Sequence, residues 1–262
     1  MSGWLSPPLT REVQLDEKWA FVGKKRCHCD ASNPEDDHKG DYWDHVGFDP
    51  EHRLVLAVVP GARSIENAEA IVEGVKRRVD DDVPLLLTSD EYPAYETAIE
   101  RTFGVPIPAP GGPGRPRIVP RRALPEGLTY ATLHKHREGR RVVAVDRRRI
   151  FGTAITLEAA PGRPEVSIEV NTSFLERRNG ADRGRNARKV RRTSRFSKDW
   201  RVHEAMSDLT MYGDNFRWEV RALRIKGEDG RWQHRSPAMA AGLADNLWTW
   251  REWFIRPTAQ SQ

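Results

Sequence analysis

Three acidic residues, far apart in the sequence, stand where a carboxylate could take part in chemistry. Asp16 lies inside the apolar and aromatic stretch VQLDEKWAFV, and Asp90 directly follows the apolar run VPLLLT. Glu176 lies at the head of a strongly basic segment. Carboxylates from separate segments can bind divalent cations together, because hard cations such as Mg²⁺ and Mn²⁺ prefer oxygen ligands. The elements around each acid decide whether the three can meet.

Residues 13–22 are predicted to form a strand, because apolar and aromatic residues dominate this stretch. Side chains alternate along a strand, so Asp16 and Glu17 point to opposite faces and cannot both serve one site. Asp16 shares its face with Gln14 and Lys18, which makes it the better candidate for a polar cleft. A salt-bridged acid at the edge of a sheet is the simpler alternative.

Asp90 lies between a predicted strand and a predicted helix. Residues 83–88 form a short continuous apolar run, which is typical of a buried strand, and residues 92–103 are predicted to be helical. An acid just past the carboxyl end of a buried strand lies where open α/β sheets usually place their sites. The alternative is that Asp90 only caps the N-terminus of the following helix.

The segment around Glu176 concentrates the positive charge of the chain. From Arg177 to Lys198 there are ten Lys or Arg against a single acid, a charge of +9, whereas the whole chain carries +5 and the remainder therefore −4. Such a concentration is typical of a surface that meets a polyanion. Ser173 and Glu176 also have the spacing of a capping box, which is the alternative role for this acid.

A helix is predicted to begin at Asn171 or Thr172. It would carry Glu176, Asn179 and Arg183 on one face, because these residues are separated by three and four positions. A carboxylate, an amide and a guanidinium in one stripe can bind a metal, orient a base or sugar, and clamp a phosphate. A solvated charged face is the alternative, although cations this dense would repel one another without a partner.

The other predicted elements complete a single sheet with helices around it. In chain order they are strands over residues 42–49 and 53–59, a helix over 64–80, strand-like sequence over 128–152, a strand over 153–157 and a helix over 203–224. Seven prolines interrupt residues 104–126 and exclude a regular element there. His134 and His136, in the basic centre of residues 128–152, are interpreted as solvated residues that face nucleic acid.

The composition excludes several classes of protein. The chain of 262 residues has 31% charged residues and no apolar run of the roughly 18 residues that a membrane helix needs. Its N-terminus lacks the basic and apolar regions of a signal peptide. Cys27 and Cys29 are too close for an ordinary scaffold disulfide, so we expect a cytoplasmic protein with no membrane partner.

Three antiparallel strands, a crossover helix and further strands predict a ribonuclease H-like α/β fold, in which a mixed sheet is flanked by helices. In that fold three carboxylates from separated positions converge at the centre of the sheet. They hold two divalent cations about 3.5–4 Å apart, which serve an in-line displacement at a phosphodiester.

Four blocks resemble the DDE (Asp-Asp-Glu) transposases of bacterial insertion sequences, nearest the IS-one-like group: VQLDEKWAFVGKK, LLLTSDEYPAY, SFLERRNGADRGRNARKVRRTSRFSK and RSPAMAAGLADNLWTWREW. They bracket about residues 13–254. The resemblance implies that Asp16, Asp90 and Glu176 are the catalytic triad and bind two Mg²⁺ or Mn²⁺ ions. It also implies a set of DNA contacts along the basic segment: Arg177, Arg178, Asn179, Arg183, Arg188, Lys189, Arg191, Arg192 and Lys198.

The sequence departs from this family in two respects. The gap between Asp90 and Glu176 spans 86 positions, longer than in compact members, which implies an insertion of roughly residues 104–163 before the last catalytic helix. The strand with Asp16 follows a tail of residues 1–11, so we expect no N-terminal DNA-recognition module, and a separate polypeptide could supply it. The catalytic domain would span residues 12–262, with a helical docking region over about 200–254.

The resemblance implies a DNA transposase in which water, and then a DNA 3′-hydroxyl, attacks a phosphodiester without a covalent enzyme intermediate. Its partners would be transposon ends and target DNA, and the pairing of two ends implies a homo-oligomer. A catalytically inactive or truncated copy that only binds DNA is one alternative, and a ribonuclease H-type nuclease is another. Phosphate contacts carry no sequence information, so the basic segment does not separate these functions.

Overall fold

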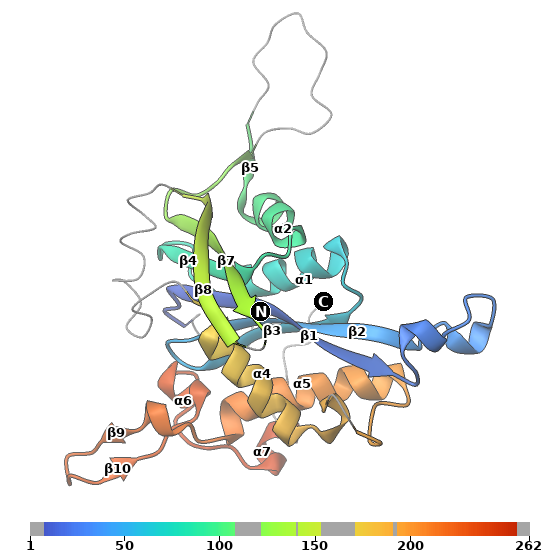
Figure 1. Ribbon diagram of the computed structural model, residues 1–262. Helices are drawn as coiled ribbons and strands as arrows, with labels where there is room; N and C mark the ends of the chain where they lie inside the picture. The colour runs from blue at the N-terminus through green and yellow to red at the C-terminus, as the bar shows by residue number, and fades with distance from the viewer. Residues whose placement is uncertain (1–7, 108–121, 140, 153–170, 191–192, 256–262) are drawn as a thin grey trace, which may run out of the picture.

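A single mixed sheet organises the computed structural model, which describes residues 8–107, 122–139, 141–152, 171–190 and 193–255 (Figure 1). Its six strands lie in the order β3-β2-β1-β4-β7-β8. They are β1 (Glu12–Val22), β2 (Gly40–Asp49), β3 (Leu54–Gly61), β4 (Leu85–Asp90), β7 (Leu128–Glu138) and β8 (Arg141–Phe151).

The sheet contains both antiparallel and parallel pairs of strands. β1, β2 and β3 form the predicted antiparallel meander, while β4 lies parallel to both β1 and β7, and β8 returns antiparallel to β7. A helical crossover is needed to join parallel strands, and α1 (Ile65–Lys76) supplies it between β3 and β4. The predicted α/β class is confirmed, and this strand order is compatible with a ribonuclease H-like fold.

Helices cover both faces of the sheet (Figure 1). α1 and α2 (Ala94–Phe103) lie against one face, and α4 (Ser173–Arg185) and α5 (Trp200–Arg217) lie against the other. α1 begins where predicted, because Ser64 accepts a hydrogen bond from the backbone N–H of Asn67 at 3.4 Å. α5 begins three residues before the predicted helix, since Asp199 caps it by accepting from Val202 N–H at 3.0 Å.

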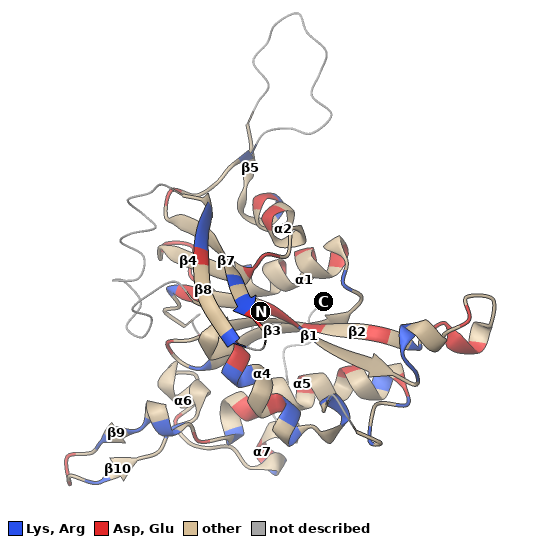
Figure 2. Cartoon of the chain, in the orientation of Figure 1, with Lys and Arg blue, Asp and Glu red and all other residues tan. Residues whose placement is uncertain are grey.

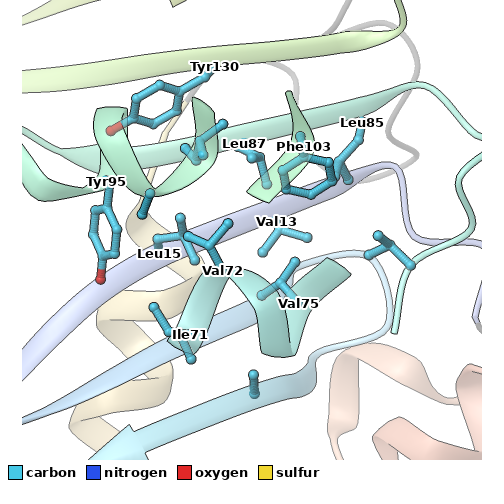
Figure 3. Close-up of a cluster of buried hydrophobic side chains, with 14 of the residues drawn as sticks. Val13, Leu15, Ile71, Val72, Val75, Leu85, Leu87, Tyr95, Phe103 and Tyr130 are labelled. Carbon is cyan, nitrogen blue, oxygen red and sulfur yellow. The ribbon is translucent and has the colours of Figure 1, made fainter. Parts of the chain in front are cut away.

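The two faces of β1 have different roles. Val13 and Leu15 point toward α1 and join Ile71, Val72 and Val75 in the larger apolar core (Figure 3). The even-numbered residues of β1 therefore point toward α4. A smaller apolar cluster, formed by residues of β2, β3, α4 and α5, fixes the helices on that second face. The predicted alternation along β1 thus sets which of its polar residues can meet α4.

From the sequence we expected an insertion over about residues 104–163. This segment instead contains two strands of the central sheet, β7 and β8. β7 pairs with β4 over six residue pairs, and β8 extends the sheet beyond it. Short strands, β5 (Val105–Pro106) and β6 (Arg122–Ala123), pair near the ends of the proline-rich stretch, where no regular element was predicted. Most of that stretch and the strand predicted over 153–157 lie outside the described residues.

The last part of the chain contributes short elements. β9 (Ile225–Lys226) and β10 (Trp232–Gln233) form a hairpin that extends away from the sheet, and α6 (Pro237–Ala240) and α7 (Trp250–Ile255) contact α5 (Figure 1). In the described ranges, no helix combines the length and the apolar character needed to cross a membrane.

Candidate active site

The first predicted acid lies on an interior strand and faces α4. Asp16 accepts a hydrogen bond from Asn179 Nδ2 at 2.7 Å, and Gln14 Oε1, on the same face of β1, accepts from Leu175 N–H at 2.9 Å. These two bonds join β1 to α4 directly. Because β1 has a neighbour on each side, the alternative of a salt-bridged acid at a sheet edge is wrong for Asp16.

The parallel pairing of β1 and β4 brings the second acid beside the first. Leu15 lies opposite Ser89 in this register, so the next residues along the two strands are Asp16 and Asp90. The N-cap alternative for Asp90 is wrong, since α2 begins at Ala94 after Pro93 and has no side-chain cap. The Asp90 carboxylate instead accepts from Thr172 Oγ1 at 3.2 Å.

The third acid approaches from α4. The capping box expected at Ser173 and Glu176 does not form, because Thr172 is the N-cap residue and makes no side-chain cap bond. Ser173 Oγ donates to Asn171 Oδ1 at 2.7 Å. The Glu176 carboxylate is therefore available to a different partner, a lysine from β7.

That lysine, Lys135, was not identified from the sequence. Its Nζ lies 3.0 and 3.3 Å from the two carboxylate oxygens of Asp90, donates to Thr172 Oγ1 at 2.9 Å, and makes a shorter contact with Glu176 Oε1. The β4–β7 register places Leu133 opposite Asp90, and Lys135 is the next residue of β7 on that face. We call Asp16, Asp90, Glu176 and Lys135 the acidic site.

The histidines that flank Lys135 have local partners. His134 Nδ1 lies 2.5 Å from Glu91 Oε2, and His136 Nε2 lies 2.6 Å from Asp146 Oδ2. Both rings are exposed. The sequence signal for Lys135 is the alternation of side chains along β7, because the histidines on either side of it point to the opposite face.

The charges of the acidic site are unbalanced. It contains three carboxyl groups and one ammonium group. Burial raises the pKa of Asp16, and the nearby Asp90 and Glu176 raise it further, against the lowering effect of hydrogen bonds from Glu17 N–H and Asn179. Burial lowers the pKa of Lys135, but Glu176 and Asp90 outweigh it, so the net pKa is raised. The excess of negative charge favours a bound cation.

The donor set fits a divalent cation. All three acids offer carboxylate oxygens, the ligands that Mg²⁺ and Mn²⁺ prefer, and the Asp90 and Glu176 side chains are 46% and 49% exposed. The Lys135 ammonium already lies between these two carboxylates and stands in for such a cation. Asp16, on the strand next to that of Asp90, would supply the third carboxylate.

A tighter group of potential ligands lies elsewhere. In the described part of the chain, Asp49, Glu51 and His52 form the one group of three whose ligand atoms all lie within 4.8 Å of one another. Asp49 Oδ1 accepts from the backbone N–H groups of Glu51 and His52, and its Oδ2 accepts from Thr10 Oγ1 at 2.7 Å. These bonds close the turn between β2 and β3, which accounts for the buried carboxylate.

Three of the expected DNA contacts are corrected by the structure. Lys189 is buried and pairs with Asp44 at 2.8 Å. Arg178 pairs with Asp214 at 3.2 Å with only 10% of its side chain exposed, and Asn179 is buried against Asp16. Since these three side chains are buried or nearly so, they do not reach a DNA phosphate.

The other expected contacts have different positions. Arg177, Arg188 and Lys198 are exposed, and Arg183 is half-buried. Arg191 and Arg192 lie outside the described residues. The basic segment is therefore only partly a surface.

A second group of cations lies on the β7–β8 hairpin (Figure 2), whose strand β7 also carries Lys135. Its exposed members are Arg137, Arg141, Arg147, Arg148 and Arg149. Arg147 and Arg149 lie opposite Leu133 and Ala131 in the register, and so on the same face of the sheet as Lys135. We call these five arginines the hairpin arginines.

Comparisons with known proteins add little to this geometry. No protein-family model matches the sequence, and no curated protein matches it. Among solved structures, one similar chain belongs to the "Crystal structure of the Mos1 Strand Transfer Complex", with 19% identity and a TM-score of 0.24. The match covers 36% of this chain and 32% of that chain. The function proposed below therefore rests on the site itself.

Proposed function

We propose that this protein is a metal-dependent DNA transposase of the DDE type, which cuts and joins DNA strands at the acidic site. The observation that supports the proposal is that Asp16 and Asp90 lie on the adjacent strands β1 and β4, while Glu176 of α4 shares the Lys135 ammonium with Asp90. Three separated carboxylates converging in this way are suited to phosphoryl transfer.

Each acid has a neighbour that supports it. Asn179 holds Asp16 in place by a hydrogen bond, and Thr172 does the same for Asp90. Glu176 lies on the first turns of α4, which is attached to β1 through Gln14. A divalent cation bound to the three carboxylates would supply a Lewis acid and an activated oxygen nucleophile.

DNA as the partner is supported by the exposed cations on two sides of the acidic site. Arg177 lies on α4 next to Glu176, and the hairpin arginines lie on the adjoining β7 and β8. Such contacts would hold the phosphate backbone and orient it toward the carboxylates. Pairing of two transposon ends by a homo-oligomer, and recognition of the ends by a separate polypeptide, are parts of the same proposal.

The test is nicking and joining of supercoiled plasmid in Mg²⁺ or Mn²⁺. We expect Asp90→Asn and Glu176→Gln to lose both activities while they retain DNA binding. Glu91→Gln is the matched control, because Glu91 directly follows Asp90, is exposed and pairs with His134. Full activity in Asp90→Asn or Glu176→Gln would contradict the proposal.

The products distinguish the alternatives. A ribonuclease H-type nuclease would nick the plasmid without joining strands. A copy that only binds DNA would give salt-sensitive binding and no cleavage with either metal. In neither case would strands be joined, with or without the substitutions at Asp90 and Glu176.

A further inference from the structure

We infer that Lys135 is a built-in cation of the acidic site, which holds Asp90 and Glu176 together until a divalent cation displaces its ammonium group. The inference rests on the proposed metal-binding role of the acids and adds to it a competition between the protein's own lysine and the metal.

The geometry of the lysine supports this role. An ammonium group has three donor hydrogens, and Lys135 Nζ has three side-chain partners: Asp90, Thr172 and Glu176. Its side chain is 15% exposed, whereas those of Asp90 and Glu176 are 46% and 49% exposed. The lysine therefore lies deeper than the carboxylates that it neutralises, unlike a lysine in a surface salt bridge.

The oxygens that the lysine uses are the ones a metal needs. Both oxygens of Asp90 lie within 3.3 Å of Lys135 Nζ, and the ammonium also contacts Glu176 Oε1. A divalent cation on these atoms would meet the ammonium at short range, where like charges repel strongly. Because lysine has a flexible four-carbon chain, it can leave the oxygens while β7 stays in place.

The first test measures the affinity for Mn²⁺ by titration with detection of the free ion. We expect Lys135→Met to bind Mn²⁺ about tenfold more tightly than the unmodified chain, since a competitor worth about 1.4 kcal/mol has been removed. Lys135→Arg keeps the charge and should stay near the original affinity. The matched control is Lys198→Met, which removes an exposed lysine on the basic segment. Equal or weaker binding in Lys135→Met would overturn the inference.

A second test uses the unmodified protein and so does not depend on a variant that folds. Amine acetylation, followed by mass spectrometry, reports how accessible each lysine is. We expect Lys135 to react slowly in EDTA and several-fold faster with saturating Mn²⁺, while Lys198 keeps a constant rate. A rate for Lys135 that is unchanged or slower with Mn²⁺ would overturn the inference.

Failure of this inference is distinguishable from failure of the proposed function. If Mn²⁺ binding is lost in Asp90→Asn but does not change in Lys135→Met, the metal site stands and only the competition is wrong. If Mn²⁺ binds equally to Asp90→Asn, Glu176→Gln and the unmodified chain, the acids do not hold the metal, and the proposed function fails as well.

Discussion

Two groups of charged side chains lie on the same face of β1, only two residues apart, and they have opposite properties. Asp16 belongs to the acidic site, and Lys18 belongs to what we call the buried ionic cluster, formed by Lys18, Asp44, Asp182 and Lys189. No part of these four side chains is exposed. Lys18 Nζ lies 3.3 Å from Asp44 and closer still to Asp182.

The difference between the two groups is one of charge balance and access to solvent. In the buried ionic cluster, burial alone would raise the pKa of Asp44, but Lys189 and Lys18 outweigh it and hold the pKa well below its usual value. In the acidic site, burial and two neighbouring acids raise the pKa of Asp16. The same residue types therefore form a buried cluster of paired charges in one place and a partly exposed site with excess negative charge in the other.

One helix links the two groups. α4 contributes Glu176 to the acidic site and Asp182 to the buried ionic cluster. The ion pair of Asp182 with Lys18 fixes the C-terminal half of α4 against β1, and this helps to fix the position from which Glu176 reaches Lys135. The buried ionic cluster therefore helps to position the acidic site. Substitutions in either group test how the two differ.

The largest effect is expected in the buried ionic cluster. Asp44→Asn leaves Lys18 and Lys189 without one of their two acids, and the loss of one partner of a buried ion pair costs about 3–5 kcal/mol in the free energy of unfolding. Urea denaturation in EDTA measures this. Asp146→Asn, at an exposed acid, is the control and should change stability by less than about 0.5 kcal/mol. A cost below about 1 kcal/mol for Asp44→Asn would remove the distinction between the two groups.

Adjacent arginines on α4 offer the next contrast. Arg178 pairs with Asp214 and also donates to the Thr210 and Met211 carbonyls, whereas Arg177 is exposed. We expect Arg178→Ala to lower the free energy of unfolding by about 3 kcal/mol. Arg177→Ala should stay within about 0.5 kcal/mol of the original stability, and it should weaken DNA binding and reduce the salt slope by about 1.

Urea denaturation and DNA titration at several salt concentrations separate these two roles. If Arg178→Ala folds normally and loses DNA affinity in the same way as Arg177→Ala, the buried position assigned to Arg178 is contradicted.

Glu17, on the opposite face of β1, provides a third case, because its carboxyl group is buried while its ion-pair partner Arg63 is 46% exposed. Glu17 lies 3.5 Å from Arg63, and burial, outweighing the lowering effect of Arg63, raises the pKa of Glu17 to about 7. The folded protein then keeps a proton that the unfolded chain loses above its ordinary pKa. The stability present at low pH is therefore lost as the pH rises from about 4.5 to about 7.

In Glu17→Gln this loss should disappear. Between pH 5 and pH 8 the original chain should lose about 2–3 kcal/mol more than the variant does. Urea denaturation across this pH range, in EDTA, is the measurement. Parallel stability curves for the two proteins would show that Glu17 titrates normally.

The smallest effect is expected at the acidic site itself. Asp16→Asn removes one of three like charges and should raise the stability of the metal-free protein by about 0.5–1 kcal/mol, because like charges in proximity oppose ionisation. With Mn²⁺ present, only the original chain should gain stability from the ion. Thermal denaturation with and without Mn²⁺ checks both parts. A loss of stability as large as that of Asp44→Asn would mean that Asp16 belongs to a structural network.

The sequence by itself determined the strands of the meander, the helices after β3 and β4, and the face on which Asp16 lies. These depend on local periodicity, in which alternate side chains of a strand point to opposite faces. It also singled out three acids, of which Asp90 and Glu176 share Lys135 and Asp16 lies on the strand next to Asp90. Their catalytic role stays a prediction.

Only the tertiary structure decided which charges are exposed and which are paired. The run from Arg177 to Lys198 is strongly basic in sequence, yet Lys189 is buried and forms an ion pair with Asp44, which is distant in the sequence. Lys135 enters the acidic site because β7 pairs in parallel with β4, and that register is set by packing across the sheet. A charge pattern records the type of each residue, whereas its partner depends on contacts between segments that only folding brings together.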